Sequence, residues 1–117
     1  MHFIQKLLVA MGGEKLAYML IGRFSQLAVD KQGIVVLKAL MNYSASSQDI
    51  RYSILFSCQQ CFYEIAYAEF GHYIIEEMFL YYNYYELIYV LGFIIGSICE
   101  LAQNQYSSSI VRKAIET

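Results

Sequence analysis

Proline is absent from the 117 residues of this chain, so the residue that most often interrupts a helix is missing. Charged residues are scarce at 15%, whereas hydrophobic residues make up 58%. A chain this apolar is not expected to be disordered, and its length suits one domain of ordinary size without a second. The composition therefore predicts a single, mainly helical domain.

Lysine and arginine are missing from a long central stretch. Residues 52–111 contain neither, although this stretch holds several glutamates, and Arg112 and Lys113 follow it directly. Nucleic-acid-binding proteins usually carry a basic surface that neutralises phosphates. With a net charge of −2, the thin basic content counts against strong phosphate contact by the middle of the chain.

Long hydrophobic runs are missing as well. Residues 87–99 are apolar and uncharged, but they number only 13, and a membrane-spanning helix needs about 20 residues. Lys6 interrupts the apolar start of the chain, and no small-residue cleavage site follows, so no secretory leader is expected. We interpret residues 87–99 as a helix buried in a folded domain. The positive mean hydropathy of +0.40 keeps a small membrane-associated helical protein as an alternative.

Metal ligands and catalytic side chains are few. Cys58 and Cys61 form a single CxxC pair, Cys99 stands apart, and His2 and His72 are the only histidines. A zinc site needs about four ligands, and a nucleophilic site needs a serine or cysteine beside its base. Neither set is evident, so we expect reduced thiols in an intracellular protein, no metal, no cofactor and no enzymatic activity.

What the chain does contain is a repeat. Three segments superpose without gaps: residues 22–41, 60–79 and 96–116. Their anchors are Gly33, Gly71 and Ser107, at spacings of 38 and 36 residues. Apolar residues recur six and five positions before each anchor and three and four positions after it, so one helix should end near the anchor and another should begin there. An anchor glycine would supply a positive φ or a tight turn, whereas the turn at Ser107 must suit a residue with a Cβ.

Further helices are expected between the anchored segments. We place them at residues 14–20, 49–56 and 84–93, with loops at 12–13 and 42–47, where Gly, Asn and Ser gather. Residues 3–8 match residues 36–41, which adds a truncated first copy. The predicted fold is an all-α solenoid of three-helix repeats that forms a single partial array over residues 1–117. The expected copies are approximately 1–20, 21–56, 57–94 and 95–117.

Neither end of this array carries the polar cap that terminal repeats need. Apolar residues stand near both ends: Phe3, Ile4, Ile110 and Val111. Exposed apolar ends of this kind favour self-association of the chain.

The anchored segments resemble the repeat of the Pumilio (PUF) family of RNA-binding proteins. Residues 70–76 (Phe-Gly-His-Tyr-Ile-Ile-Glu) fit its pattern best, and residues 27–38 fit it well. Residues 101–114 resemble the family's penultimate repeats, in which a serine run replaces Gly-Asn-Tyr. The resemblance implies a right-handed α-solenoid in which the second helix of each repeat lines a concave face, and each repeat reads about one base of single-stranded RNA.

The resemblance also implies which residues touch RNA. In such repeats the residues one and five positions after the anchor contact a base edge, and the residue two positions after it stacks between bases. The implied RNA-binding residues are Ile34, Val35 and Lys38 in the second copy, His72, Tyr73 and Glu76 in the third, Ser108, Ser109 and Arg112 in the fourth, and His2 and Gln5 in the truncated first.

These residues differ in what they offer a base. Glu76 can accept hydrogen bonds from a guanine edge, and Tyr73 offers a stacking platform. Ser108 with Arg112 resembles the pair that the family uses for cytosine, and Gln5 suits uracil or adenine. The second copy departs from the pattern. Its Ile34 and Val35 offer neither a hydrogen bond nor good stacking, which leaves Lys38 as a phosphate contact.

The function implied by the resemblance is binding of single-stranded RNA, such as an mRNA 3′ untranslated region, in post-transcriptional regulation. The expected location is the cytoplasm, or alternatively the nucleolus, and protein partners would bind the convex face. The alternative is a degenerate helical scaffold that binds protein or structured RNA without reading bases. The acidic middle of the chain and the Ile34–Val35 pair favour that alternative.

Overall fold

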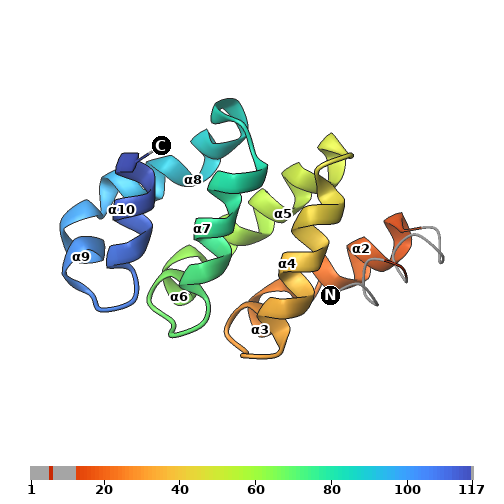
Figure 1. The fold of residues 1–117 in the computed structure, drawn as a ribbon, viewed down its shortest axis with the longest axis horizontal. Coiled ribbons are helices and arrows are strands. Elements are labelled where there is room, and N and C mark those ends of the chain that lie inside the picture. Colours follow the sequence, from red (N-terminus) through yellow and green to blue (C-terminus); the bar gives the residue numbers. More distant parts are fainter. Residues whose placement is uncertain (1–5, 7–12, 117) are drawn as a thin grey trace.

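The computed structural model describes residue 6 and residues 13–116. Within that part helices are the only regular secondary structure, which confirms the all-α fold class. The helices follow one another as three triplets (Figure 1). The first triplet is α2 (Glu14–Ile21), α3 (Phe24–Ala28) and α4 (Gly33–Ser44). The second is α5 (Gln48–Gln60), α6 (Phe62–Ala66) and α7 (His72–Tyr81). The third is α8 (Tyr84–Gly96), α9 (Ile98–Gln103) and α10 (Ser108–Glu116).

Corresponding helices of the triplets lie side by side in rows (Figure 1). One row consists of α4, α7 and α10, and a second consists of α2, α5 and α8, with each helix packed on the next. The short helices α3, α6 and α9 lie along the lower edge of Figure 1. The described residues form an elongated body of 43 × 28 × 23 Å.

The helices expected at residues 14–20, 49–56 and 84–93 are present as α2, α5 and α8. Each expected copy begins with the anchored pair of helices, whereas each observed triplet begins one helix earlier, with α2, α5 or α8. The loop expected at residues 42–47 is partly wrong, because α4 continues to Ser44. The Ser44 hydroxyl donates to the Met41 carbonyl at 2.7 Å, so this buried polar side chain is satisfied within the helix.

Capping side chains explain where the two long helices begin. The Ser47 hydroxyl accepts from the Ile50 N–H at the start of α5. At the start of α8, the Asn83 side chain accepts from the Glu86 N–H at 2.9 Å, and the Glu86 carboxylate accepts from the Asn83 N–H at 3.0 Å. This reciprocal capping box satisfies two backbone donors that a helix start leaves free.

Buried apolar side chains from all three triplets form one continuous core. Leu37, Ile54, Phe62, Ile75 and Ile94 are among its nearly inaccessible members. Because a single triplet of this size cannot bury its own apolar face, contact between triplets supplies the core.

The positive φ expected as one role for the anchor glycines is wrong. Among the described residues only Gly13 has a positive φ, 48°, whereas Gly71 has a φ of −64°. Gly33 and Gly71 instead permit close backbone approach. A Cβ at Gly33 would lie 2.2 Å from the Leu27 carbonyl oxygen, and one at Gly71 would lie 2.5 Å from that of Ile65.

The third anchor replaces this close approach with a hydrogen bond. The Ser107 hydroxyl donates to the Leu101 carbonyl at 2.7 Å, and this carbonyl corresponds to those that lie against the two glycines. Ser107 is fully buried, so the third junction is wide enough to hold a side chain in place of a glycine. The expectation that this turn suits a residue with a Cβ is confirmed.

In the part of the chain that the structure describes, no helix combines the length and apolarity that crossing a membrane requires. The most apolar stretch belongs to α8, which has 13 residues and ends at Gly96.

Candidate RNA-binding surface

The residues implied as base contacts lie at and near the beginnings of α4, α7 and α10, the three helices of one row (Figure 1). Tyr73 is 44% exposed and Val35 40% exposed, and Arg112 is also exposed. Lys38, Glu76, Ser108 and Ser109 are half-buried, whereas His72 and Ile34 are buried. His2 and Gln5 lie outside the described residues.

Tyr73 is the most prominent aromatic side chain of this row. The Lys38 ammonium, from the preceding triplet, lies 5.4 Å from the centroid of its ring. The His72 ring lies against it with a centroid separation of 4.0 Å and a tilt of 38°. Lys38 also approaches the Glu77 carboxylate, at 3.9 Å. These contacts restrict an exposed aromatic ring, as a stacking platform requires.

His72, Glu76 and Ser109 form a hydrogen-bonded cluster that joins α7 to α10. The His72 Nδ1 lies 2.5 Å from Glu76 Oε2, and the Ser109 hydroxyl donates to the same carboxylate oxygen at 2.7 Å. Ser109 Oγ is also 3.1 Å from His72 Nδ1, and Tyr106 stacks parallel to the His72 ring at 6.0 Å. His72 is therefore a positioning residue for Glu76, and a buried imidazole in this environment offers little edge to a base.

The cluster does not form a catalytic relay. In a serine–histidine–acid relay, the acid and the nucleophile bind opposite nitrogens of the imidazole ring. Here Glu76 and Ser109 both approach Nδ1 of His72. These three groups hold two helices together.

A contact between neighbouring triplets recurs along the row. Lys38, five positions after its anchor, reaches Tyr73, two positions after the next anchor. Glu76, again five positions after its anchor, accepts from Ser109, two positions after the next. The resemblance assigns these positions to RNA contacts, and in the structure they also contact each other. The equal distances of these residues from their anchors were the sequence feature that could have predicted this pairing.

The second copy is as poor in base-reading groups as expected. Ile34 is 8% exposed and belongs to the core, so its side chain faces away from any ligand on the surface. Val35 is exposed but has no aromatic face and no hydrogen-bonding group. Lys38 is the polar group that α4 contributes at the predicted positions.

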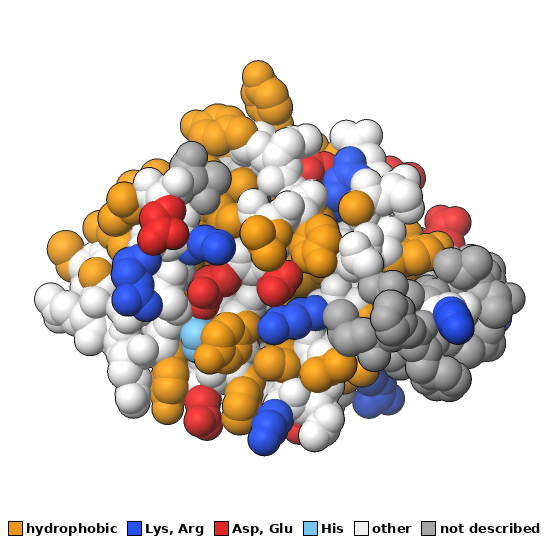
Figure 2. Space-filling model, in the orientation of Figure 1, with side chains coloured by type: hydrophobic (Ala, Val, Ile, Leu, Met, Phe, Trp, Pro, Cys, Tyr) orange, Lys and Arg blue, Asp and Glu red, His pale blue; other side chains and the backbone are white. Residues whose placement is uncertain are grey.

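The side of the molecule that carries this row mixes charges of both signs. Figure 2 shows basic and acidic side chains next to one another, with apolar side chains between them, rather than one continuous basic patch. A surface of this kind offers local phosphate contacts and makes a weak salt-dependent contribution to binding.

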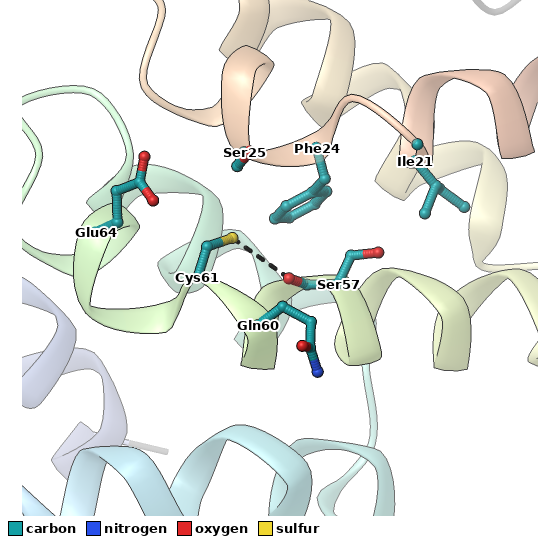
Figure 3. A pocket seen from close by; sticks show the side chains of 8 residues that line it. Ile21, Phe24, Ser25, Ser57, Gln60, Cys61 and Glu64 are labelled. Carbon is teal, nitrogen blue, oxygen red and sulfur yellow. Dashed lines mark hydrogen bonds between the residues drawn. The ribbon is translucent and has the colours of Figure 1, made fainter.

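A separate hollow of about 330 Å³ lies between the first two triplets (Figure 3). Its lining includes Phe24, Gln60, Cys61 and Glu64, and the Cys61 thiol donates to the Ser57 carbonyl at 3.3 Å. Burial, followed by the nearby Glu64 charge, raises the pKa of Cys61 to about 11. Burial likewise raises the pKa of Cys58. The CxxC pair is therefore held as thiols and is unsuited to redox chemistry.

Alkylation should distinguish the three cysteines. At pH 8 only about one Cys61 side chain in a thousand would be a thiolate, so iodoacetamide is expected to modify the exposed Cys99 first in the native protein. Mass spectrometry should find one label on native chain, three on unfolded chain and none on native Cys99→Ser. Rapid native labelling of Cys61 would contradict the assigned pKa shift.

No group of three or more metal-ligating side chains is arranged to hold an ion among the residues that the structure describes. No protein-family model, curated protein or solved structure matches this chain. The resemblance to PUF repeats therefore depends on the anchored segments of the sequence.

Proposed function

We propose that this chain binds single-stranded RNA along the row formed by α4, α7 and α10, as a right-handed α-solenoid of PUF-type repeats. Tyr73 carries the proposal. Its ring is 44% exposed and is restrained by Lys38 of the first triplet and His72 of the second. It stands at the position where the family stacks a base. The same row presents Glu76 and Arg112 at the position of the family's base-edge contacts.

The geometry modifies the roles that the resemblance implies. Tyr73 is the platform, and Glu76 offers its carboxylate to a guanine edge while Ser109 and His72 fix its orientation. Ser108 and Arg112 form the edge pair of the next triplet, with Ser109 occupied by Glu76 and not available for stacking. The biological role that follows is binding of mRNA in post-transcriptional regulation.

Replacing Tyr73 with alanine is expected to weaken RNA binding about 5- to 150-fold, because a base–aromatic stack contributes about 1–3 kcal/mol. Fluorescence anisotropy with labelled RNAs of about ten nucleotides, at low and moderate salt, measures this effect. Tyr85→Ala is the matched control, because Tyr85 is 79% exposed but lies on α8, in the other row. Equal affinities for the two variants, or no saturable binding at low salt, would reject the proposal.

A scaffold that does not read bases is the second candidate. The engagement of Glu76 by His72 and Ser109 favours it, because a base must compete with contacts that already satisfy the carboxylate. Comparing wild type with Glu76→Gln on RNAs that differ at one base separates the two functions. Base reading predicts an altered preference at that base, whereas the scaffold predicts that no preference changes.

A further inference from the structure

The third triplet has a face that no described residue covers. This trailing face is the side of α8, α9 and α10 that points away from the second triplet. It consists of Ile88, Ile95, Ile98, Cys99 and Ile115. All five are exposed, with Ile88 at 56%, Ile95 at 67% and Ile115 at 75%. Exposed apolar residues gathered on one face mark an interaction surface.

The register of the triplets shows what these positions do elsewhere in the chain. For Ile88, Ile95, Ile98 and Cys99, the residue 36 positions earlier contacts the third triplet. Tyr52, at the register of Ile88, packs edge-on against Tyr89 at 5.6 Å. Gln59, at the register of Ile95, donates to the Tyr89 carbonyl at 2.8 Å.

The same holds for α9. Phe62, at the register of Ile98, stacks on Phe93 with a centroid separation of 5.1 Å. Tyr63, at the register of Cys99, shares a hydrogen bond of 2.7 Å with Ser97. The trailing face therefore continues the interface that already joins triplets within the chain, and here its side chains have nothing to contact among the described residues.

We propose that the trailing face binds a second copy of this chain, with the two trailing faces packed against each other about a two-fold axis. An apolar face is complementary to itself, which is what a two-fold interface requires. The proposal does not depend on RNA binding. It would place two α4–α7–α10 rows in one particle.

A head-to-tail arrangement, in which the trailing face of one copy packs on the first triplet of another, fits less well. Within the chain, Lys38 of the first triplet contacts Tyr73 and Glu77 of the second. Glu76 of the second contacts Ser109 of the third. The second and third triplets thus each present a polar or aromatic side chain to the triplet before them. The first triplet carries Val35 and Ala39 at the registers of Tyr73 and Glu77, and neither could partner Arg112 of another copy. Arg112 has no hydrogen bond or ion pair with the described residues, and a two-fold arrangement leaves it available to a carboxylate of the second copy.

Sedimentation velocity of the full chain, over about a hundredfold range of concentration, tests the proposal. We expect a mass that rises from 13.5 kDa toward twice that value and stops there. The substitutions Ile88→Lys and Ile95→Lys should each shift the dimerisation constant at least tenfold toward monomer, with unchanged helical circular dichroism. Leu80→Lys is the control, since Leu80 is 65% exposed on α7 and not part of the trailing face.

Each result decides the matter. A monomer at every concentration overturns the proposal, and so does a dimer that persists in both lysine variants. Assemblies that grow beyond a dimer would point to head-to-tail stacking and overturn the two-fold arrangement. Diamide, a two-electron thiol oxidant, adds an independent readout. It should join two Cys99 thiols, which are exposed on the trailing face, as a disulfide-linked dimer that Cys99→Ser lacks.

Discussion

Substitution of Gly33 by alanine is expected to cost this protein about 3 kcal/mol, the upper end of the range for overpacking a close-packed interior. The added Cβ would lie 2.2 Å from the Leu27 carbonyl oxygen and 2.7 Å from the Leu27 Cα. Both are backbone atoms, so no side-chain rotation can relieve the clash, and the α3–α4 junction must open. Opening it would disturb the packing of the first triplet on the second.

Urea unfolding followed by circular dichroism measures the effect as a lower transition midpoint. Gly71→Ala should cost less, because its nearest backbone contact is 2.5 Å and the next is an Ile65 side-chain atom at 3.0 Å. Gly92→Ala is the matched control, because its Cβ would meet no heavy atom within 4 Å apart from the adjacent residues and the backbone of its own helix. It should stabilise α8 by about 0.5–1 kcal/mol. Equal stability of Gly33→Ala and Gly92→Ala would show that the close approach is not a structural requirement.

Periodicity sufficed to predict the helical class, because helix formation follows local apolar spacing, but the copies it predicted are offset by one helix from the observed triplets. It also located the anchors. It could not say why glycine stands there, because a glycine required for a positive φ and one required for space look the same in a sequence. Ser107 already indicated the answer. A serine at the register of the two glycines argues against a positive φ that all three copies would share.

The candidate site was predicted only at the level of positions. The resemblance implied corresponding positions for Tyr73, Glu76 and Arg112, and the structure has them on α7 and α10 of one row. The resemblance could not foresee that Glu76 accepts from Ser109 of the next triplet, because side-chain contacts between triplets depend on how closely the helices stack. For the same reason the sequence could not show that Arg51 and Glu86, 35 residues apart, form an ion pair between triplets.

Removal of Arg51 is expected to destabilise the chain by about 3–5 kcal/mol, the usual cost of stranding one member of a buried ion pair. Its Nε lies 2.5 Å from Glu86 Oε2, and the Glu86 side chain is only 3% exposed. The same guanidinium donates to the carbonyls of Ser44 at 3.3 Å and Ala45 at 2.8 Å, at the end of α4. Arg51 thus connects all three triplets, since it lies on α5 and binds the end of α4 and the start of α8.

A double-mutant cycle isolates this connection. Arg51→Met leaves an uncompensated buried carboxylate. Glu86→Gln keeps an oxygen acceptor for the Asn83 N–H, but it removes the charge and replaces the Oε2 acceptor of Arg51 with an amide donor. The double variant should therefore recover at least about 1.5 kcal/mol of the summed losses. The Lys38–Glu77 pair, at 3.9 Å with side chains 32% and 22% exposed, provides the comparison and should show a coupling below about 1 kcal/mol.

Salt separates the two pairs further, because half-exposed charges are screened and buried ones are screened much less. Raising sodium chloride to about 0.5 M should remove most of the Lys38–Glu77 coupling and leave that of Arg51 and Glu86 nearly unchanged. An Arg51–Glu86 coupling as small and as salt-sensitive as the Lys38–Glu77 coupling would mean that this ion pair does not fix how the triplets stack. A large, salt-resistant coupling would instead identify Arg51 as the residue that fixes how the three triplets stack, and with it the spacing of Lys38, Tyr73 and Arg112 along the row proposed to bind RNA.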